Sequence, residues 1–351
     1  MRIDEALLLD AVDTVQSDVP GLLIGGSAAF AGALAARGRH TVWLPLDARE
    51  MNLADERVET LPDAGSPLPP DAVFGVVILP APPERDLGRR WLVLARNHLA
   101  PGGRAVLAGA NATGIRSTIA DGRALFGEPL REDYRSKHRI AVFVAGGRPR
   151  DLPGWMAEPG VAEGTWGEVS LEVDGSRLRL ATLPGVFSGA RLDAGTELLL
   201  AHLAVEPGER VLDVGCGAGT IGFVALRRGA RSVLMTDVNL LAIAAVRETL
   251  RRDRIAAARV VAGDVYDGLD PVDRFDLIVS NPPFHQGKTV DYGMPQRLIA
   301  EADRYLAPHG RLVIVANAFL PYERLLEERF RVVQPIAATR RFKVLLARRP
   351  R

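Results

Sequence analysis

The stretch Leu212-Asp213-Val214-Gly215-Cys216-Gly217-Ala218-Gly219 decides the fold expected for this chain of 351 residues. Its first part is apolar except for Asp213, and glycine then recurs at positions 215, 217 and 219. Glycine tolerates left-handed backbone dihedrals and lets a ligand approach the backbone closely. A helical pattern follows over 220–228. The stretch therefore predicts a strand, a tight turn and a helix, the unit from which open parallel α/β sheets are built.

Short apolar runs alternate with helical patterns along the rest of this half of the chain. Strands are expected at 210–214, 232–236, 259–261, 275–279 and 311–315, and helices at 220–228, 240–252 and 295–306. The last two apolar runs, 331–335 and 342–347, are typical of a closing hairpin. This alternation predicts a mostly parallel, doubly wound sheet that is buried on both faces.

The first half of the chain repeats this plan. Three pairs of segments match in the same order: LLIGGSAAFAG (22–32) with LDVGCGAGTIG (212–222), FGVVILPAPP (74–83) with FDLIVSNPPF (275–284), and HLAPGGR (98–104) with YLAPHGR (305–311). Three ordered matches indicate an ancient duplication, and their long period excludes a solenoid.

A Pro/Gly-rich stretch separates the two copies and predicts a linker. We expect a first domain at 1–150, a linker at 151–165 and a second domain at 166–351. Within the second domain, Asp174-Gly175 lies between two alternating runs and predicts a β-hairpin.

Charge and cysteine content exclude several classes of function. The net charge is +1, so no global basic field indicates nucleic acid. The local exception is 331–351, where seven Arg or Lys and no acid form either a solvated edge or a phosphate-contacting strip. The single cysteine, Cys216, excludes an internal disulfide and a Cys-based zinc cluster, and we expect no metal.

The N-terminus gives no sign of a targeting signal. It is acidic and amphipathic, unlike a signal peptide, and no apolar run reaches membrane-spanning length. We therefore expect a soluble, cytoplasmic monomer without a membrane partner.

Two acidic residues follow successive strands and suit an adenine nucleoside. Asp237, 22 positions after Gly215, is placed to accept both ribose hydroxyls. Asp264 is placed to accept from the adenine amino group and Val265 to pack on the adenine; a turn or helix-cap aspartate is the alternative for Asp264.

Asp213 discriminates between two cofactors. Dinucleotide-binding folds usually carry an apolar residue there, whereas a carboxylate suits the ammonium group of S-adenosylmethionine (SAM). The expected SAM-binding residues are Asp213, Gly215, Cys216, Gly217, Gly219, Asp237, Val238, Asp264, Val265 and Asn281.

The segment Asn281-Pro282-Pro283-Phe284 follows the strand expected at 275–279 and predicts chemistry on a planar amine. The lone pair of an exocyclic aromatic amine is delocalised into the ring. The Asn281 side-chain oxygen and the Pro282 carbonyl, fixed by the proline dihedrals, can accept its two N–H groups and aim the lone pair outward. Phe284 offers a stacking face. No strong base is required, so we expect His285 to position the loop or pack against it.

DVGCGAG together with NPPF resembles class I SAM-dependent methyltransferases. The segments LPGVFSGARLDAGTELLL (183–200), NPPFHQG (281–287), VANAFLPY (315–322) and RRFKV (340–344) resemble the RsmC family of ribosomal RNA guanine-N2 methyltransferases. The resemblance implies two tandem Rossmann-like methyltransferase domains with mostly parallel, seven-stranded sheets, the N-terminal one degenerate. It implies SAM as cofactor and Asn281, Pro282 and Phe284 as the guanine site.

Further expectations follow from the same resemblance. The substrate is a guanine of 16S ribosomal RNA, presented as a 30S subunit or assembly intermediate. His285, Arg340, Arg341 and Lys343 are expected on the substrate side. The LDAGT segment lies against the cofactor in the family pattern, although Thr196 equally suits a cap for a helix at 197–203.

The first copy lacks the residues on which the second depends. Leu23 stands in place of Asp213, Ser27 and Ala29 in place of two glycines, and Pro80 in place of Asn281. We expect this copy to bind no SAM, to stabilise the active half and to grip RNA. Arg131, Arg135, Lys137 and Arg139 are candidates for the RNA contact, with a solvated surface as the alternative.

Other functions remain open from the sequence. Within enzymes they are 23S guanine-N2, adenine-N6 and glutamine-N5 methyltransferases, and more distantly a NAD-dependent oxidoreductase. Outside enzymes, a non-catalytic RNA-binding or chaperone module suits the first half better than the second.

Overall fold

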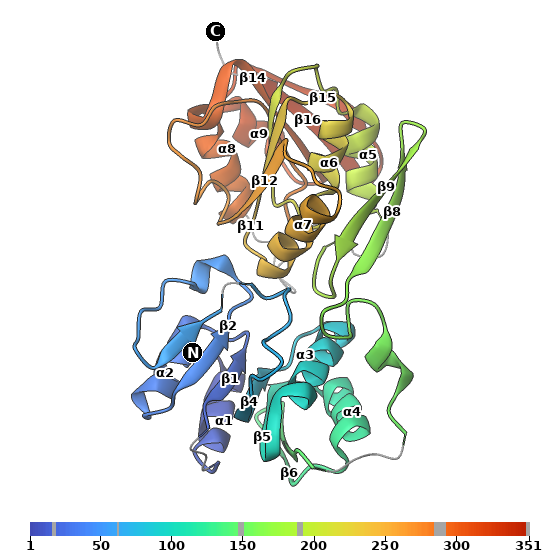
Figure 1. Ribbon diagram of the computed structural model, residues 1–351. Helices are drawn as coiled ribbons and strands as arrows, with labels where there is room; N and C mark the ends of the chain where they lie inside the picture. The colour runs from blue at the N-terminus through green and yellow to red at the C-terminus, as the bar shows by residue number, and fades with distance from the viewer. Residues whose placement is uncertain (16–18, 62, 147–150, 188–191, 284–292, 349–351) are drawn as a thin grey trace. The chain divides into compact units, whose positions relative to one another are not determined.

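The computed structural model describes residues 1–15, 19–61, 63–146, 151–187, 192–283 and 293–348. The chain divides into two compact units (Figure 1). Unit 1 is Met1–Gly167 with Leu183–Gly185, and unit 2 is Glu168–Thr182 with Val186–Arg351. Each unit is described by itself below.

Unit 2 is built on a seven-stranded sheet in the order β12-β11-β10-β13-β14-β16-β15. The strands are β10 (Arg210–Val214), β11 (Ser232–Asp237), β12 (Ala258–Ala262), β13 (Phe275–Ser280), β14 (Leu306–Asn317), β15 (Val332–Ala338) and β16 (Phe342–Arg348). The first five in this order pair in parallel, and β16 pairs antiparallel with both β14 and β15. This confirms the predicted mostly parallel sheet and its closing hairpin.

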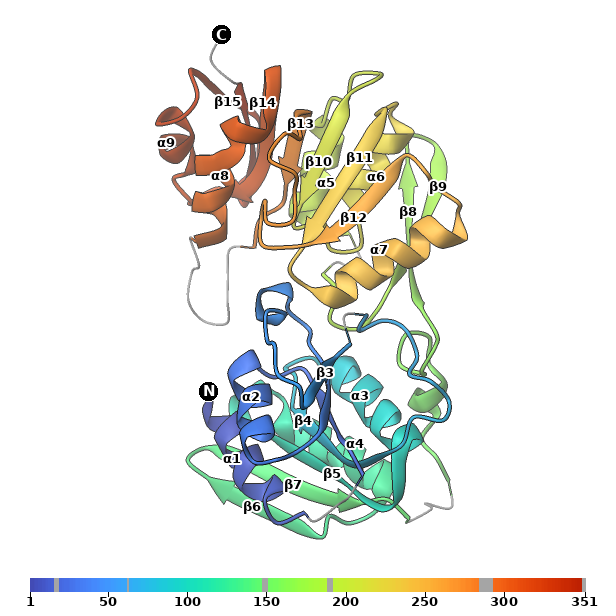
Figure 2. The same ribbon diagram turned by 60° about the vertical axis from the view of Figure 1, so that its left-hand side comes forward.

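Side chains alternate along the strands between two buried faces. Leu212 and Val214 belong to one core cluster, whereas Val211, the residue before Leu212, belongs to the cluster on the opposite face. Helices α8 (Gly293–Tyr305) and α9 (Tyr322–Glu327) cover the first face, and α5 (Ala194–His202), α6 (Thr220–Arg227) and α7 (Leu240–Arg252) cover the second (Figures 1 and 2). By this alternation Asp213 lies on the face that α6 covers.

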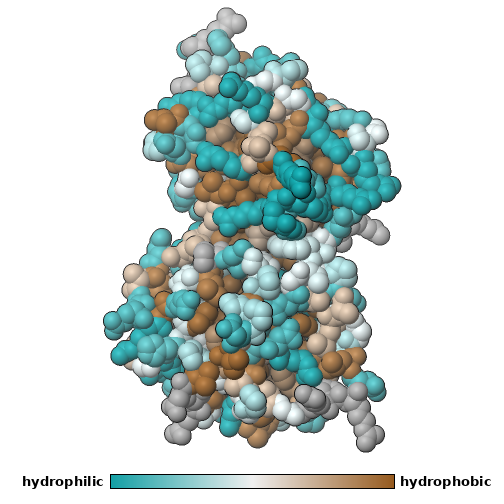
Figure 3. Space-filling model, in the orientation of Figure 1, coloured by the Kyte–Doolittle hydropathy of each residue, from teal (hydrophilic) through white to brown (hydrophobic). Residues whose placement is uncertain are grey.

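Helix α7 shows how the sequence pattern produces such a layer. Its first two turns, Leu240–Val246, are buried, whereas Arg247, Arg251 and Arg252 are exposed. In Figure 3 hydrophilic residues gather on the surface over this helix. The amphipathic pattern therefore seals one face of the sheet and leaves charge to the solvent.

The predicted hairpin is present as β8 (Gly167–Val173) and β9 (Ser176–Thr182). Asp174 and Gly175 have φ values of 49° and 76°, as a two-residue hairpin turn with left-handed central residues requires. The hairpin packs on α7, where the Thr249 hydroxyl receives the Ala181 N–H at 2.9 Å.

Unit 1 repeats the topology, with the strand order β3-β2-β1-β4-β5-β7-β6. Its strands are β1 (Gly21–Ile24), β2 (Thr41–Leu44), β3 (Val58–Thr60), β4 (Phe74–Pro80), β5 (Leu99–Ala110), β6 (Arg131–Arg135) and β7 (His138–Val144), and its helices are α1 (Ile3–Val12), α2 (Ala28–Ala36), α3 (Arg85–His98) and α4 (Ile115–Phe126). Leu23 pairs with Ile78 as Asp213 pairs with Val279. The equal register confirms the duplication that the repeated segments predicted.

The glycine-rich turn of unit 1 is occupied by the unit's own side chains. Glu5, which is fully buried, accepts the Ser27 N–H at 2.8 Å and the Ser27 hydroxyl at 3.1 Å. Glu50 accepts the Ala28 N–H at 2.8 Å. Two carboxylates therefore satisfy the N-terminus of α2, where unit 2 keeps a glycine turn.

Residues 151–165 fall within unit 1. Arg90 of α3 is buried and donates to the Gly160 carbonyl at 2.8 Å, and burial lowers the pKa of Arg90 to about 10. The His98 ring nitrogen Nε2 lies 2.9 Å from the Glu163 carboxylate. These contacts attach the Pro/Gly-rich segment to α3. None of the helices in the described ranges combines the length and the apolar character that a membrane crossing needs.

Candidate active site

The glycine-rich turn leaves the carboxyl end of β10 and starts α6. Gly215, Gly217 and Gly219 have φ values of 71°, 55° and 80°, in the left-handed region that favours glycine. A Cβ on Gly219 would lie 2.7 Å from the Phe223 ring. The Gly215 and Cys216 N–H groups donate to the Thr236 carbonyl at 2.8 and 3.0 Å, so the turn is fixed against β11.

Asp213 lies beneath this turn with no exposed surface. Its Oδ2 accepts the Gly222 N–H of α6 at 2.8 Å, whereas Oδ1 is buried without a hydrogen-bond partner. Burial raises the pKa of Asp213 to about 7, against the lowering effect of the Gly222 hydrogen bond. The observed contact ties β10 to α6; the predicted contact with a ligand ammonium group remains a prediction.

Asp237 ends β11 beside the turn. Its Oδ2 accepts the Gly217 N–H and its Oδ1 the Asn239 N–H, both at 2.8 Å. Val238 between them is half-buried. Cys216 is buried, and burial raises the pKa of its thiol, which leaves it neutral and unsuited to nucleophilic chemistry. The predicted ribose residue and the glycine turn therefore lie in direct contact.

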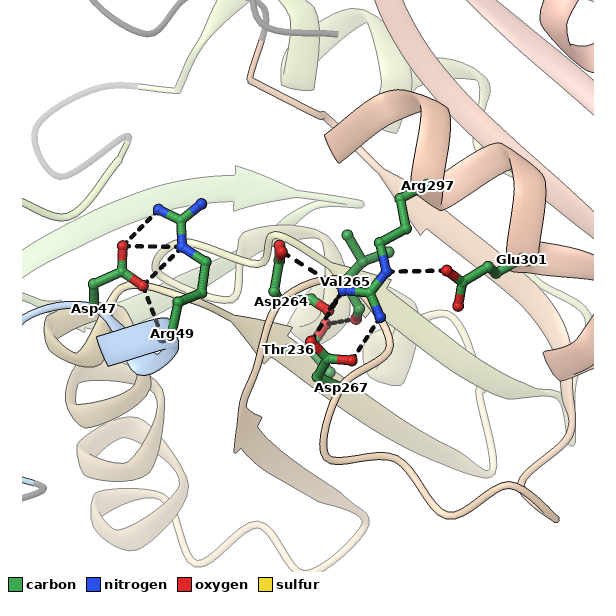
Figure 4. Close-up of polar contacts among 8 residues, drawn as sticks. All are labelled: Asp47, Arg49, Thr236, Asp264, Val265, Asp267, Arg297 and Glu301. Carbon is green, nitrogen blue, oxygen red and sulfur yellow. Dashed lines mark hydrogen bonds and ion pairs between the residues drawn. The ribbon is translucent and has the colours of Figure 1, made fainter. Parts of the chain in front are cut away.

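The segment after β12 is a tight turn that α8 holds in place. Val265 has a φ of 57° and is 3% exposed, and its carbonyl accepts the Thr236 hydroxyl at 3.1 Å. So much burial leaves little of the Val265 side chain for the predicted contact with adenine. Arg297 of α8 donates to the Asp264 carbonyl at 3.0 Å, and its Nη1 lies 3.6 Å from the Asp264 carboxylate (Figure 4).

The same arginine pairs with two further acids. Arg297 donates to Asp267 Oδ2 and to Glu301 Oε1, each at 3.0 Å (Figure 4). The hydrogen bond to Arg297 lowers the pKa of Asp267. Within the part of the chain that the structure describes, no group of three or more His, Cys, Asp or Glu is arranged to hold a metal ion.

Asn281 follows β13, and its side-chain amide faces the start of α5. Its Nδ2 donates to the Thr196 hydroxyl at 2.8 Å and to Asp193 Oδ2 at 3.1 Å. The Ser280 hydroxyl donates to the Val214 carbonyl at 2.7 Å, which joins the end of β13 to the end of β10. Asn281 and the glycine turn therefore share one edge of the sheet. Pro282 is buried and Pro283 exposed, while Phe284 and His285 lie outside the described residues.

The alternative considered for Thr196, a cap for a helix at 197–203, is not what the structure shows. Helix α5 begins at Ala194, and Asp193 caps it by accepting the Gly195 N–H at 2.9 Å and the Thr196 N–H at 3.2 Å. Asp193, three positions before Thr196, thus accepts the N–H groups at the start of the helix. The Thr196 hydroxyl instead accepts a hydrogen bond from Asn281 Nδ2.

The predicted basic residues on the substrate side differ in exposure. Arg340 and Arg341 are exposed in the turn between β15 and β16, and the Arg341 carbonyl accepts the Ala318 N–H beyond β14 at 2.8 Å. The side chain of Lys343 is 12% exposed and pairs with Glu323 at 2.6 Å. The Lys343 ammonium group is therefore engaged by Glu323 and mostly buried, so little of its surface is available to a phosphate.

Three features of this edge were missed from the sequence. They are the contact of Asp193 with the Asn281 amide, the role of Arg297 at the 263–268 turn, and Phe319, which is 70% exposed just beyond β14. Phe319 lies in the segment 315–322 that carried the family resemblance, so the exposed aromatic could have been noticed. The other two depend on tertiary contacts.

Comparison with known proteins identifies the family. The methyltransferase small domain matches residues 177–346. The chain is 38% identical over 248 residues to ribosomal RNA small subunit methyltransferase C of Haemophilus influenzae (strain PittEE), covering 70% of this chain and 71% of that protein. The chain belongs to the ribosomal RNA small subunit methyltransferase C family.

Two further relatives agree with this assignment. The family member from Chromohalobacter salexigens is 46% identical over 174 residues, 48% of this chain and 51% of that protein. The solved structure of the T. thermophilus 16S rRNA N2 G1207 methyltransferase (RsmC) in complex with AdoMet and guanosine has a TM-score of 0.81 and 28% identity, covering 99% of this chain and 92% of that one. The family resemblance and the tandem fold expected from the sequence are thus confirmed.

Proposed function

We propose that this protein transfers the methyl group of SAM to the exocyclic N2 amine of a guanine in 16S ribosomal RNA. The observation that carries the proposal is the Asn281 amide at the carboxyl end of β13, joined through Ser280 and Val214 to the glycine-rich turn. The relatives add the substrate: those compared are named for small-subunit ribosomal RNA, and the T. thermophilus structure contains AdoMet and guanosine.

The residues at the turn fit SAM. Its three glycines have left-handed φ values, which let a ligand approach the backbone of the turn closely. Asp237 would hold the ribose, and the turn after β12, with Asp264, would hold the adenine. The unpartnered Asp213 Oδ1 would favour a cationic group nearby. When bound, SAM supplies an electrophilic methyl on a sulfonium centre.

The chain's own contribution to the chemistry is orientation. The Asn281 Oδ1 and the Pro282 carbonyl accept the two N–H groups of the guanine amine, which turns its lone pair away from the ring. Both acceptors directly follow β13, where Ser280 and the Asn281 amide are held by hydrogen bonds to Val214 and Thr196, so little reorganisation is needed during reaction. Phe284 would stack on the base. No general base enters, because the amine loses its proton after the nitrogen has become cationic.

Ribosomal RNA would reach this edge over exposed groups of unit 2. Arg340 and Arg341 present guanidinium groups for phosphates, and Phe319 presents an aromatic face for an unstacked base. A guanine amine is accessible only in an unpaired or everted base. We therefore propose that the partner is a 30S subunit or assembly intermediate, met in the cytoplasm by a monomer.

In this proposal the first domain, residues 1–150, has a structural and RNA-gripping role. Residues 151–165 link it to the catalytic domain at 166–351. Arg135 and Lys137 are exposed at the β6–β7 turn. Arg131 and Arg139 instead pair with Asp133 and Glu132. The first two are thus the better candidates for RNA contact.

Labelled SAM offered with naked 16S RNA, 30S subunits, 23S RNA and 50S subunits tests the proposal, followed by mapping of the modified nucleotide. We expect N2-methylguanine in 16S RNA. Label in 23S RNA alone would overturn the substrate, and label on adenine or protein would overturn the acceptor.

Asn281→Ala tests the acceptor role. It should retain SAM binding and lose at least about 100-fold in kcat, because one of two preorganised acceptors is removed. The exposed Asn52→Ala of unit 1 serves as the matched control and should keep kcat. Turnover of Asn281→Ala within a few-fold of the unmodified protein would show that the amide does not hold the amine.

A further inference from the structure

We infer that Asp193 and Thr196 act as positioning residues that decide which way the Asn281 amide faces. The inference rests on the proposed function, because it matters only if the Asn281 oxygen receives the guanine amine. Asp193 discriminates between the two amide orientations, and Thr196 anchors the chosen one.

An asparagine at this position meets a physical difficulty. The oxygen and nitrogen of a primary amide are nearly equal in size, so a half-turn of the side chain exchanges an acceptor for a donor. With Nδ2 toward the substrate, two N–H donors would confront the N–H groups of the guanine amine. A site that depends on Asn281 therefore needs a neighbour that excludes the turned amide.

Thr196 alone cannot supply that discrimination. Its hydroxyl, 2.8 Å from Asn281 Nδ2, is able both to donate and to accept, so it suits either orientation. An ionised carboxylate only accepts. With the amide turned, Asn281 Oδ1 would face Asp193 Oδ2 at the 3.1 Å now spanned by a hydrogen bond, and two acceptors would repel. Asp193 thus keeps the Asn281 NH2 group facing the start of α5 and leaves Oδ1 facing away from it.

The carboxylate is itself held rigidly. Asp193 Oδ2 accepts from the Gly195 N–H, the Thr196 N–H and Asn281 Nδ2. A Cβ on Gly195 would lie 2.9 Å from Asp193 Oδ2 and 3.4 Å from the Phe342 ring of β16. Glycine at 195 therefore lets the start of α5 bring the carboxylate against the strand end. Thr196 is 4% exposed, so water competes little for its hydroxyl.

Unit 1 provides an internal comparison. The position equivalent to Asn281 is Pro80, which has no amide to orient. Glu5, third residue of α1 counted from its cap as Thr196 is of α5, binds Ser27 instead. The positioning residues are thus absent from the unit that has no amide at this position, as expected if their role is to orient that amide.

Asp193→Asn is the decisive variant. An asparagine retains an oxygen that can cap α5, and its own NH2 group can donate to a turned Asn281, so the helix survives while the discrimination is lost. We expect kcat to fall about 10- to 100-fold, with the Kd for SAM within about twofold and Tm nearly unchanged. Asp193→Ser, also a good N-cap but too short to reach Asn281, should behave alike.

The Thr196 variants separate anchoring from folding. Thr196→Val removes the acceptor at equal volume and should lower kcat about tenfold. Thr196→Ser should restore most of it, whereas a purely structural role of the methyl group predicts the reverse order. If Thr196→Val fails to fold, Thr196→Ser and the two Asp193 variants still test whether these residues orient the Asn281 amide.

Each outcome has one meaning. Loss of kcat in Asn281→Ala together with normal kcat in Asp193→Asn and Asp193→Ser overturns the positioning role and leaves the proposed function intact. Normal kcat in Asn281→Ala overturns the acceptor role on which both depend. A parallel loss of SAM affinity and Tm in both Asp193 variants would show that the substitutions disturb the fold of α5 and would overturn the positioning role.

Discussion

Asp213 combines full burial with a free carboxylate oxygen, and this has a thermodynamic consequence at the residue scale. Burial raises its pKa to about 7 in the folded chain, well above that of an unfolded aspartate. The folded state therefore binds more protons than the unfolded state between pH 4 and 7. By linkage, the contribution of Asp213 to stability is complete below about pH 4 and is lost as the pH rises through about 7.

Asp213→Asn should remove this loss. At pH 8 the variant is expected to be more stable than the unmodified protein, by as much as about 4 kcal/mol, because each pKa unit corresponds to about 1.4 kcal/mol. At pH 4 the advantage should vanish. Denaturant unfolding at both pH values measures it; an advantage of equal size at pH 4 and pH 8 would show that Asp213 is already ionised in the fold.

SAM binding provides the second test of the same residue. If the ligand ammonium group approaches Asp213, it favours the charged form, so binding at pH 6.5 should release a proton from the protein. Calorimetry in buffers of different ionisation enthalpy counts the protons. We expect release of up to about one proton, absent in Asp213→Asn. Equal proton release in both proteins would separate Asp213 from the ammonium contact.

At the scale of elements, Arg297 connects α8 to the turn after β12. That turn has a strained residue, Val265, and a Cβ on Gly263 would approach the Asp267 carbonyl to 2.0 Å. A left-handed valine persists only when its surroundings determine it, and Arg297 supplies the hydrogen bond to the Asp264 carbonyl.

Arg297→Met should therefore weaken SAM binding about tenfold while leaving kcat at saturating SAM nearly unchanged, because the turn forms part of the predicted adenine site and not of the reacting centre. Glu301→Gln is the matched control, since it removes one partner of Arg297 and keeps the contact with the turn. A fall in kcat without loss of SAM affinity in Arg297→Met would contradict the assignment.

Elements were predictable from the sequence wherever local pattern determines them. The strand at 210–214 and the helix at 240–252 have the predicted bounds, since apolar period and flanking turn residues are local properties. Strand β14 is longer than predicted, from Leu306 instead of 311, because its pairing with β13 continues across a register shift between Phe275 and Leu277. Such pairing cannot be inferred from one segment alone.

The contacts of the site also divide into those that could be predicted from the sequence and those that could not. The proximity of Asp237 to the glycine turn follows from the rule that parallel strands present their carboxyl ends at one edge. The contacts of Asn281 with Asp193 and Thr196 join residues 88 and 85 positions apart, and they depend on where α5 starts. The sequence suggested a helix at 197–203, whereas α5 begins at Ala194, so the contact of its first turn with the amide was not predicted.

At the scale of the whole molecule, the two units have one strand order but different residues at the cofactor edge. Gly25 donates to the Leu44 carbonyl as Gly215 donates to that of Thr236, each at 2.8 Å, so Pro45 stands in unit 1 where Asp237 stands in unit 2. With Leu23 in place of Asp213, unit 1 lacks both of the carboxylates that we propose as acceptors for the ribose and the ammonium group. Glu5 and Glu50 already occupy the N–H groups at the start of α2.

The full chain should therefore bind one SAM. Titration calorimetry is expected to give a stoichiometry near one. Asp237→Ala should abolish the whole signal, because it removes the carboxylate that we propose accepts from the ribose, together with its hydrogen bond to the Gly217 N–H. Asp47→Ala in unit 1, two residues after the Pro45 that is equivalent to Asp237, is the matched control and should leave the stoichiometry unchanged. A residual site in Asp237→Ala would assign SAM to unit 1.

Restoring one residue should not restore the lost site. Leu23 is fully buried, so Leu23→Asp would place a charge in the core of unit 1. We expect destabilisation of several kcal/mol and no second equivalent of SAM. Gain of a second site from this single change would mean that Pro45 and the two carboxylates at α2 do not block the turn, and that unit 1 lost its cofactor through Leu23 alone.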